Sequence, residues 1–130
     1  MIILYDNILV TADCSGYTFL SVYFRISAEE KIMVTFISMI RLTDQGMKDI
    51  KSSCDRAEDF KATAAKLGIE VSSLYWTMGA VDGVLVFQSP DEETATAAML
   101  KLGASGNVHT QTFRAYDVEQ MKRIVAKVPD

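Results

Sequence analysis

The feature that most constrains this chain is a set of short β-branched and aromatic stretches that are apolar at both odd and even positions. Successive side chains of a strand point to opposite faces of the sheet, so a strand with one face in water should alternate between apolar and polar residues. Residues 34–40 and 84–88 do not alternate in this way. The sequence therefore predicts a sheet that needs a cover on each of its two faces.

The order of the segments from Met33 onward is typical of a ferredoxin-like α+β fold. Apolar residues recur at helical spacing between the strand-like stretches. We predict strands at 34–40, 71–78, 84–88 and 107–115, and helices at 44–67, 90–103 and 117–128. Two strand–helix–strand halves in succession give βαββαβ with a C-terminal helix. Right-handed crossovers then place the first two helices on one face of a four-stranded antiparallel sheet.

Polar residues mark where these helices begin and end. Ser89 is the predicted N-cap of the second helix, followed by Pro90 and an acidic first turn. Thr43 and Asp117 are placed to cap the other two. Ser52-Ser53 predicts a break or kink in the first helix, and Gly68 is placed to end it.

The second face of the sheet needs a cover that two helices on the first face cannot supply. Several hundred Å² of apolar surface is more than monomers usually expose. At ~25 cal/mol per Å², covering it contributes on the order of 10 kcal/mol before association costs. We predict that the same face of a second copy covers it, giving a dimeric α+β barrel. In the alternative, residues 1–32 fold over this face.

Residues 1–32 differ in character from the rest of the chain. They contain strand-like pieces at 2–5, 8–11 and 17–26 around a Ser15-Gly16 turn, with little helical periodicity. Codons for Glu29-Glu30 just before Met33 can read as a ribosome-binding site. We therefore predict an N-terminal extension at 1–32, arising from a mis-assigned start, and a domain at 33–130. A genuine N-terminal arm is the alternative.

Composition excludes several classes of protein. The chain has 130 residues, of which 49% are apolar and 23% charged, with a formal net charge of −4. Its Lys and Arg residues form no stripe, which argues against nucleic acid as a partner. No apolar run is long enough to span a membrane. Two cysteines in no metal-ligand spacing favour a cytoplasmic protein with reduced thiols and no metal or cofactor.

The candidate functional residues lie near the 79–83 turn and on the strands beside it. Asp82 is a turn-former or a functional carboxylate. His109, the single histidine, is a structural residue or a proton carrier, because imidazole readily changes charge near neutral pH. Tyr75 is a catalytic candidate. Trp76 is a core or interface residue, or else the wall of a ligand pocket.

Three further side chains are candidates by their residue type alone, because the sequence spacing gives none of them a second functional residue. Arg114, like Arg41, lies near the end of a strand and is a surface residue or a candidate for binding an anion. These two arginines are not predicted to converge. Cys54 lies at a possible helix start, where a thiol can be reactive.

The stretches TFISMIRLTDQGMKDIK and YWTMGAVDGVLVFQSPDEETATAAMLKLG resemble the GYD-domain family of small bacterial proteins. The resemblance begins at Met33 and implies a dimeric α+β barrel. The motif turn is Gly79-Ala80-Val81-Asp82, in which Val81 stands where the family has Tyr. A catalytic role for that Tyr would be lost here, whereas a packing role would tolerate Val.

These patterns favour a homodimeric binding or regulatory module over a catalyst. The alternative is a small cofactor-independent enzyme, of oxygenase or isomerase type, acting on an apolar or aromatic small molecule. A third possibility is a subunit of a larger assembly, docked through its terminal helix or N-terminal arm. A cavity lined by Tyr75 or Trp76, with His109 or Asp82 pointing into it, would favour the enzyme.

Overall fold

The computed structural model describes residues 2–5, 8–11 and 31–130. The chain divides into two compact units, Met1–Lys31 and Ile32–Asp130. The first unit contains two of the predicted strands, β1 (Ile2–Tyr5) and β2 (Ile8–Thr11), and the structure pairs them antiparallel. The third predicted strand piece, 17–26, lies outside the described residues. Within the described ranges, no helix combines the length and the apolar character needed to cross a membrane.

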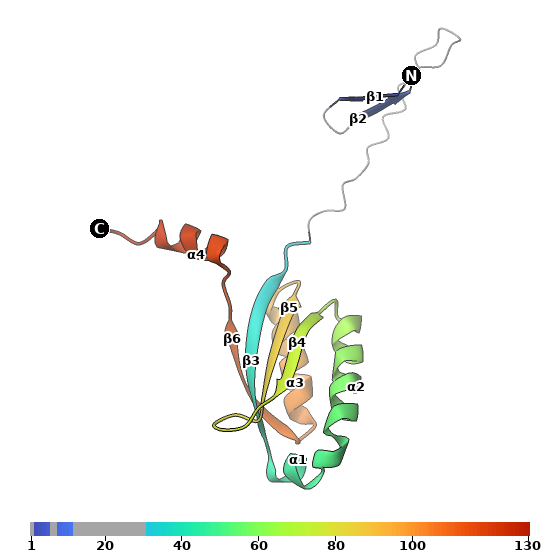
Figure 1. Cartoon of the computed structure of the whole chain (residues 1–130), viewed down its shortest axis with the longest axis vertical. Coiled ribbons are helices and arrows are strands. Elements are labelled where there is room, and N and C mark those ends of the chain that lie inside the picture. Colours follow the sequence, from blue (N-terminus) through green and yellow to red (C-terminus); the bar gives the residue numbers. More distant parts are fainter. Residues whose placement is uncertain (1, 6–7, 12–30) are drawn as a thin grey trace. The chain divides into compact units, whose positions relative to one another are not determined.

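The second unit is built on a four-stranded antiparallel sheet. Its strands are β3 (Val34–Leu42), β4 (Glu70–Trp76), β5 (Gly83–Ser89) and β6 (Val108–Arg114). They lie side by side in the order β4-β5-β3-β6, so the first and third strands of the unit occupy the centre (Figure 1). With two helical crossovers and a final helix, this is the predicted ferredoxin-like α+β fold.

The first crossover is interrupted, as its serines predict. It consists of α1 (Asp44–Lys48), the short 3-10 helix η1 (Ile50–Ser52) and α2 (Ser53–Lys66). The Thr43 side chain accepts a hydrogen bond from the Gly46 amide and caps α1. Gly68 has a φ of 76°, a conformation that favours glycine, and it ends α2.

The second crossover, α3 (Glu92–Ala104), corrects one prediction. Its N-cap is Asp91, which accepts a hydrogen bond of 2.7 Å from the Thr94 amide. Ser89 is instead the last residue of β5, fully buried, with its hydroxyl donating to the Asp91 carbonyl oxygen. The Thr94 amide also holds the pKa of the Asp91 carboxyl below its ordinary value, because it favours the charged acceptor.

The core lies between one face of the sheet and the helices α2 and α3. Phe36 and Phe87, from the two central strands, stack with ring centroids 5.4 Å apart. Around them the helices place small side chains, which lets the helix backbones approach the sheet closely. The buried apolar residues are Phe36, Ala64, Ile69, Leu85, Phe87, Ala95, Ala98 and Met99.

The final helix, α4 (Val118–Val125), has the predicted N-cap Asp117, which forms a capping box with Gln120. It extends beyond the end of β6, and none of its residues is buried (Figure 1). Its apolar side chains lie on one face and are exposed to solvent. They are Val118, Met121, Ile124 and Val125, continued by Val128 just beyond the helix.

Candidate functional site

The sheet face turned away from α2 and α3 is apolar and uncovered within residues 31–130. Residues directly opposite each other on neighbouring strands share a face. One row across the sheet joins Ser73, Val86, Ile37 and Phe113, and the next joins Tyr75, Val84, Met39 and Gln111. We call the six apolar members of these rows the open face: Ile37, Met39, Tyr75, Val84, Val86 and Phe113.

The exposure of the open face matches the sequence prediction of a sheet that is apolar on both sides. Tyr75 is 62% exposed and Phe113 is 53% exposed, although both are large aromatic residues. The four aliphatic members on the central strands β3 and β5 are partly buried by their neighbours. A contiguous patch of this kind is a common mark of an interaction surface.

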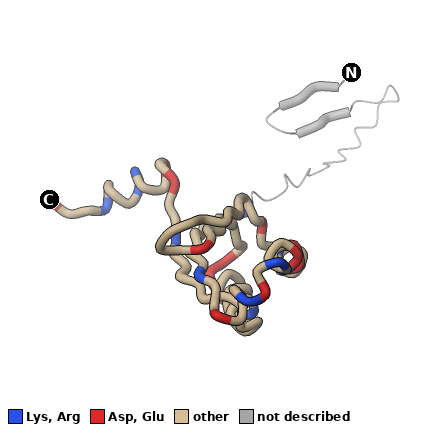
Figure 2. Tube along the Cα trace, turned by 60° about the horizontal axis from the view of Figure 1, so that its bottom comes forward, with Lys and Arg blue, Asp and Glu red and all other residues tan. Residues whose placement is uncertain are grey.

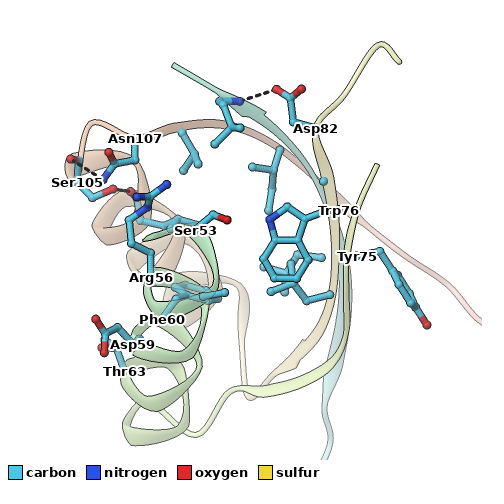
Figure 3. Close-up of a pocket in the computed structure, with 18 of the residues that line it drawn as sticks. Ser53, Arg56, Asp59, Phe60, Thr63, Tyr75, Trp76, Asp82, Ser105 and Asn107 are labelled. Carbon is cyan, nitrogen blue, oxygen red and sulfur yellow. Dashed lines mark hydrogen bonds between the residues drawn. The ribbon is translucent and has the colours of Figure 1, made fainter. Parts of the chain in front are cut away.

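The opposite, helix-covered face contains a cavity of about 300 Å³ at the end of the sheet near α1. Its walls are apolar side chains from the sheet, from α2 and from the end of α3. They include Ile40, Phe60, Leu74, Trp76, Leu85, Leu102 and Val108. Figure 3 shows Trp76 directed toward α2 across this space and Tyr75 directed away from it. The two neighbouring aromatics therefore serve different faces, as alternation along a strand requires.

Polar groups lie around the cavity wall, and several of them are already engaged. Arg56 makes an ion pair of 2.7 Å with Asp49 and a hydrogen bond of 2.8 Å to the Asp49 carbonyl oxygen. Asn107 accepts a hydrogen bond from the Gln45 side chain. Lys101 also lines the cavity, and its side chain has no ion pair or hydrogen bond among residues 31–130. Arg56, Phe60 and Lys101 have no distinguishing local sequence signal.

Asp82 fixes the predicted turn to the C-terminal end of β3 by two hydrogen bonds. Its Oδ2 accepts a hydrogen bond of 2.7 Å from the Leu42 amide, and its own amide donates to the Ile40 carbonyl oxygen at 2.8 Å. The motif turn also needs Gly79, whose φ of 123° lies in the region that favours glycine. This geometry accounts for Asp82 as a turn-former, although the residue also lines the cavity.

Replacement of Asp82 tests that structural role. Asp82→Ala removes the acceptor for the Leu42 amide, so we expect a loss of about 1–3 kcal/mol in the free energy of unfolding. Asp82→Asn keeps a carbonyl oxygen in the same place and should recover most of this loss. Denaturant unfolding of both variants measures the difference. Wild-type stability in Asp82→Ala would show that this bond is not what Asp82 contributes.

His109 does not meet Asp82 in the cavity. It lies on the same side of the sheet as the open face, opposite Arg41 on β3, and its side chain is exposed. The two residues line a shallow hollow beside the 43–45 segment. No cluster of three His, Cys, Asp or Glu residues that could hold a metal ion occurs in the described ranges.

Arg114 is engaged in local contacts. Its guanidinium lies 4.6 Å from the ring centroid of Tyr116 and 5.9 Å from that of Phe36. It also donates to the carbonyl oxygens of Thr35 and Ala115. Arg41 lies at the other end of β3, opposite His109, so the two arginines do not converge. Cys54 is exposed on α2.

Basic and acidic residues are interspersed over the described part of the chain, without a basic stripe (Figure 2). The second unit is thus a small ferredoxin-like α+β domain with an uncovered apolar sheet face and an apolar cavity. The chain belongs to the GYD domain family, whose sequence model matches residues 36–125. This confirms the resemblance seen in the sequence.

Two comparisons place the chain among characterised proteins. It is 31% identical over 90 residues to the glutamine synthetase and cystathionine beta-lyase binding protein of Thermus thermophilus, in a match that covers 68% of this chain and 95% of the relative. The crystal structure of MtbAldR matches with a TM-score of 0.50 and 17% identity, over 66% of this chain. The match spans only 55% of the MtbAldR chain, and at this identity it shows the fold alone.

Proposed function

We propose that this protein is a homodimeric protein-binding module. The observation that carries the proposal is the open face, because its six apolar side chains lack a cover in residues 31–130. Packing this face on its own copy about a two-fold axis buries both patches at once. It also leaves α2 and α3 on the outside, which gives a dimeric α+β barrel.

Sedimentation equilibrium of the full chain at micromolar concentration tests the association directly. One chain has a mass of 14.4 kDa, and we expect a species of twice that mass. A single species with the mass of one chain would contradict the homodimer. Repeating the measurement on a chain that begins at Met33 separates the dimer from the alternative in which residues 1–32 cover the sheet.

Two observations support the binding function: the name of the relative and the exposed apolar side of α4. The relative is named as a binding protein for two enzymes, glutamine synthetase and cystathionine beta-lyase. In this chain α4 presents an apolar stripe of helical spacing that contacts no other element closely within residues 31–130. An amphipathic helix of this kind is suited to lie in an apolar groove of a partner. We assign α4 as the surface that docks on such an enzyme.

Two α4 variants with the same total charge test this assignment. Met121→Glu combined with Ile124→Glu places charge in the apolar stripe and should weaken binding by at least about tenfold, because the partner's groove would have to accept unpaired carboxylates. Arg123→Glu makes the same change in net charge on the polar side of the helix and should leave binding within about threefold.

The measurement is calorimetric titration of each variant with the glutamine synthetase and the cystathionine beta-lyase of the same cell. Equal weakening by the stripe variant and by Arg123→Glu would show that net charge, and not the apolar stripe, governs the contact. No binding of either enzyme by the wild-type chain would contradict the partner assignment, while the homodimer would be judged separately by sedimentation.

The alternative function, a small enzyme, receives one supporting observation. A cavity with Trp76 in its wall is present, and Asp82 contributes to its lining. However, the Asp82 carboxylate is bonded to the Leu42 amide, and His109 lies on the other side of the sheet. The candidate catalytic groups are therefore not assembled around one reacting position.

A further inference from the structure

The cavity beneath α2 is a second feature that protein binding through the open face or α4 does not use. At about 300 Å³ it lies at the lower end of the range for small-molecule sites. Apolar side chains line it, and among them Trp76 remains half-exposed to solvent. Covering such apolar walls with an apolar ligand is favourable, because it removes their surface from water.

The sheet provides this space through one residue pair. Trp76 lies opposite Gly83 in the β4–β5 ladder, so the indole has no side chain beside it on β5. A methyl group at Gly83 would come within 3.1 Å of the Tyr75 carbonyl oxygen. As a result, Trp76 remains 51% exposed while its ring forms one side of the cavity (Figure 3).

Hydrogen-bond donors lie at the wall of the otherwise apolar space. Lys101 near the end of α3 is without an ion-pair partner in residues 31–130. Asn107 also lines the space, but its side-chain amide already donates to the Ser105 carbonyl oxygen. Arg56 is held by Asp49 on the α2 side. A flat apolar ring would fit against the indole, and a polar substituent on that ring would reach a donor.

We propose that this cavity binds a small ring compound with one hydrogen-bond-accepting end, such as a hydroxyl or carboxylate. The ring packs between Trp76 and Phe60, and the accepting end faces Lys101. This site goes beyond the proposed protein binding, since it lies on the helix-covered face of the sheet. Of the open-face residues only Tyr75 contributes to its lining, and the Tyr75 side chain points away from it.

The protein contains an intrinsic fluorophore that can report ligand binding. Trp76 is the single tryptophan, so its fluorescence reports on the cavity wall without a label. The probes are benzyl alcohol and benzoate, which share a ring and differ in the charge of the accepting end. We expect a saturable change of Trp76 fluorescence with each probe and a rise in unfolding temperature. No saturable change up to about 10 mM would overturn the proposal.

A pair of α2 variants locates the binding. Ala57 lines the cavity, whereas Ala62 is exposed on the same helix. Ala57→Phe fills the space and should weaken benzyl alcohol binding at least about tenfold, while Ala62→Phe should leave it unchanged. Undiminished binding by Ala57→Phe would place the probe elsewhere and overturn the proposal. Circular dichroism and sedimentation of both variants verify that fold and association are retained.

The accepting end is tested with Lys101→Met, which keeps the length of the side chain and removes its charge. We expect benzoate to bind about threefold to tenfold more weakly to this variant, with benzyl alcohol changed by less than about twofold. Equal affinity of wild type and Lys101→Met for benzoate would overturn the assignment of Lys101 to the polar end.

Discussion

Ile37→Glu should convert the proposed homodimer to single chains at micromolar concentration. Ile37 lies on the central strand β3, directly opposite Val86 on one side and Phe113 on the other. In the proposed dimer a carboxylate at this position would be buried against apolar side chains without a partner, which is strongly unfavourable. We expect the dissociation constant to rise at least about a hundredfold, equivalent to about 3 kcal/mol.

The fold of the single chain should survive this change. Ile37 points away from the core formed with α2 and α3, so the variant loses association and keeps its helices. Leu100→Glu is the matched control, because Leu100 is 69% exposed on α3 and lies outside the open face. Sedimentation of the two variants at equal concentration makes the comparison. An Ile37→Glu variant that still sediments as a dimer would move the interface away from the open face.

Phe87→Ala should cause the largest loss of stability in the core. Phe87 is fully buried at the centre of the sheet and stacks on Phe36. Truncation removes the apolar ring and leaves a cavity that the small neighbours Ala64, Ala95 and Ala98 cannot easily fill, so we expect a loss of about 3–5 kcal/mol. Phe87→Leu leaves a smaller cavity and should cost clearly less. Denaturant unfolding of both variants measures this, and a loss below about 1 kcal/mol for Phe87→Ala would contradict the proposed core.

Part of the site was accessible from the sequence because it depends on local alternation. Tyr75 and Trp76 are adjacent on one strand, so their opposite orientations follow from strand geometry. In the same way, Ile37 and Met39 lie on the face opposite Phe36 because successive side chains of β3 alternate. The break at Ser52-Ser53 and the capping box at Asp117 were also local, since each depends on side chains competing for nearby backbone groups.

The position of the cap on α3 shows where local reasoning was insufficient. Ser89, Pro90 and Glu92 form a good capping pattern, yet β5 continues to Ser89 because Val34 pairs with it across the sheet. The strand pairing takes Ser89 into the ladder and moves the cap to Asp91. A contact 55 positions away in the chain (89 − 34) thus decided which of two nearby polar residues begins the helix.

The sequence by itself determined the order of the elements, the two apolar faces of the sheet and the family, because each is written in the spacing of nearby residues. Only the tertiary structure decided that Asp82 bonds to Leu42, that His109 lies away from the cavity, and that Arg56, Trp76 and Lys101 surround it. Arg56, Trp76 and Lys101 come from the separate elements α2, β4 and α3, and the distances between them depend on how the helices pack on the sheet. Hydrophobic packing is non-directional, so no local pattern specifies where it leaves space unfilled.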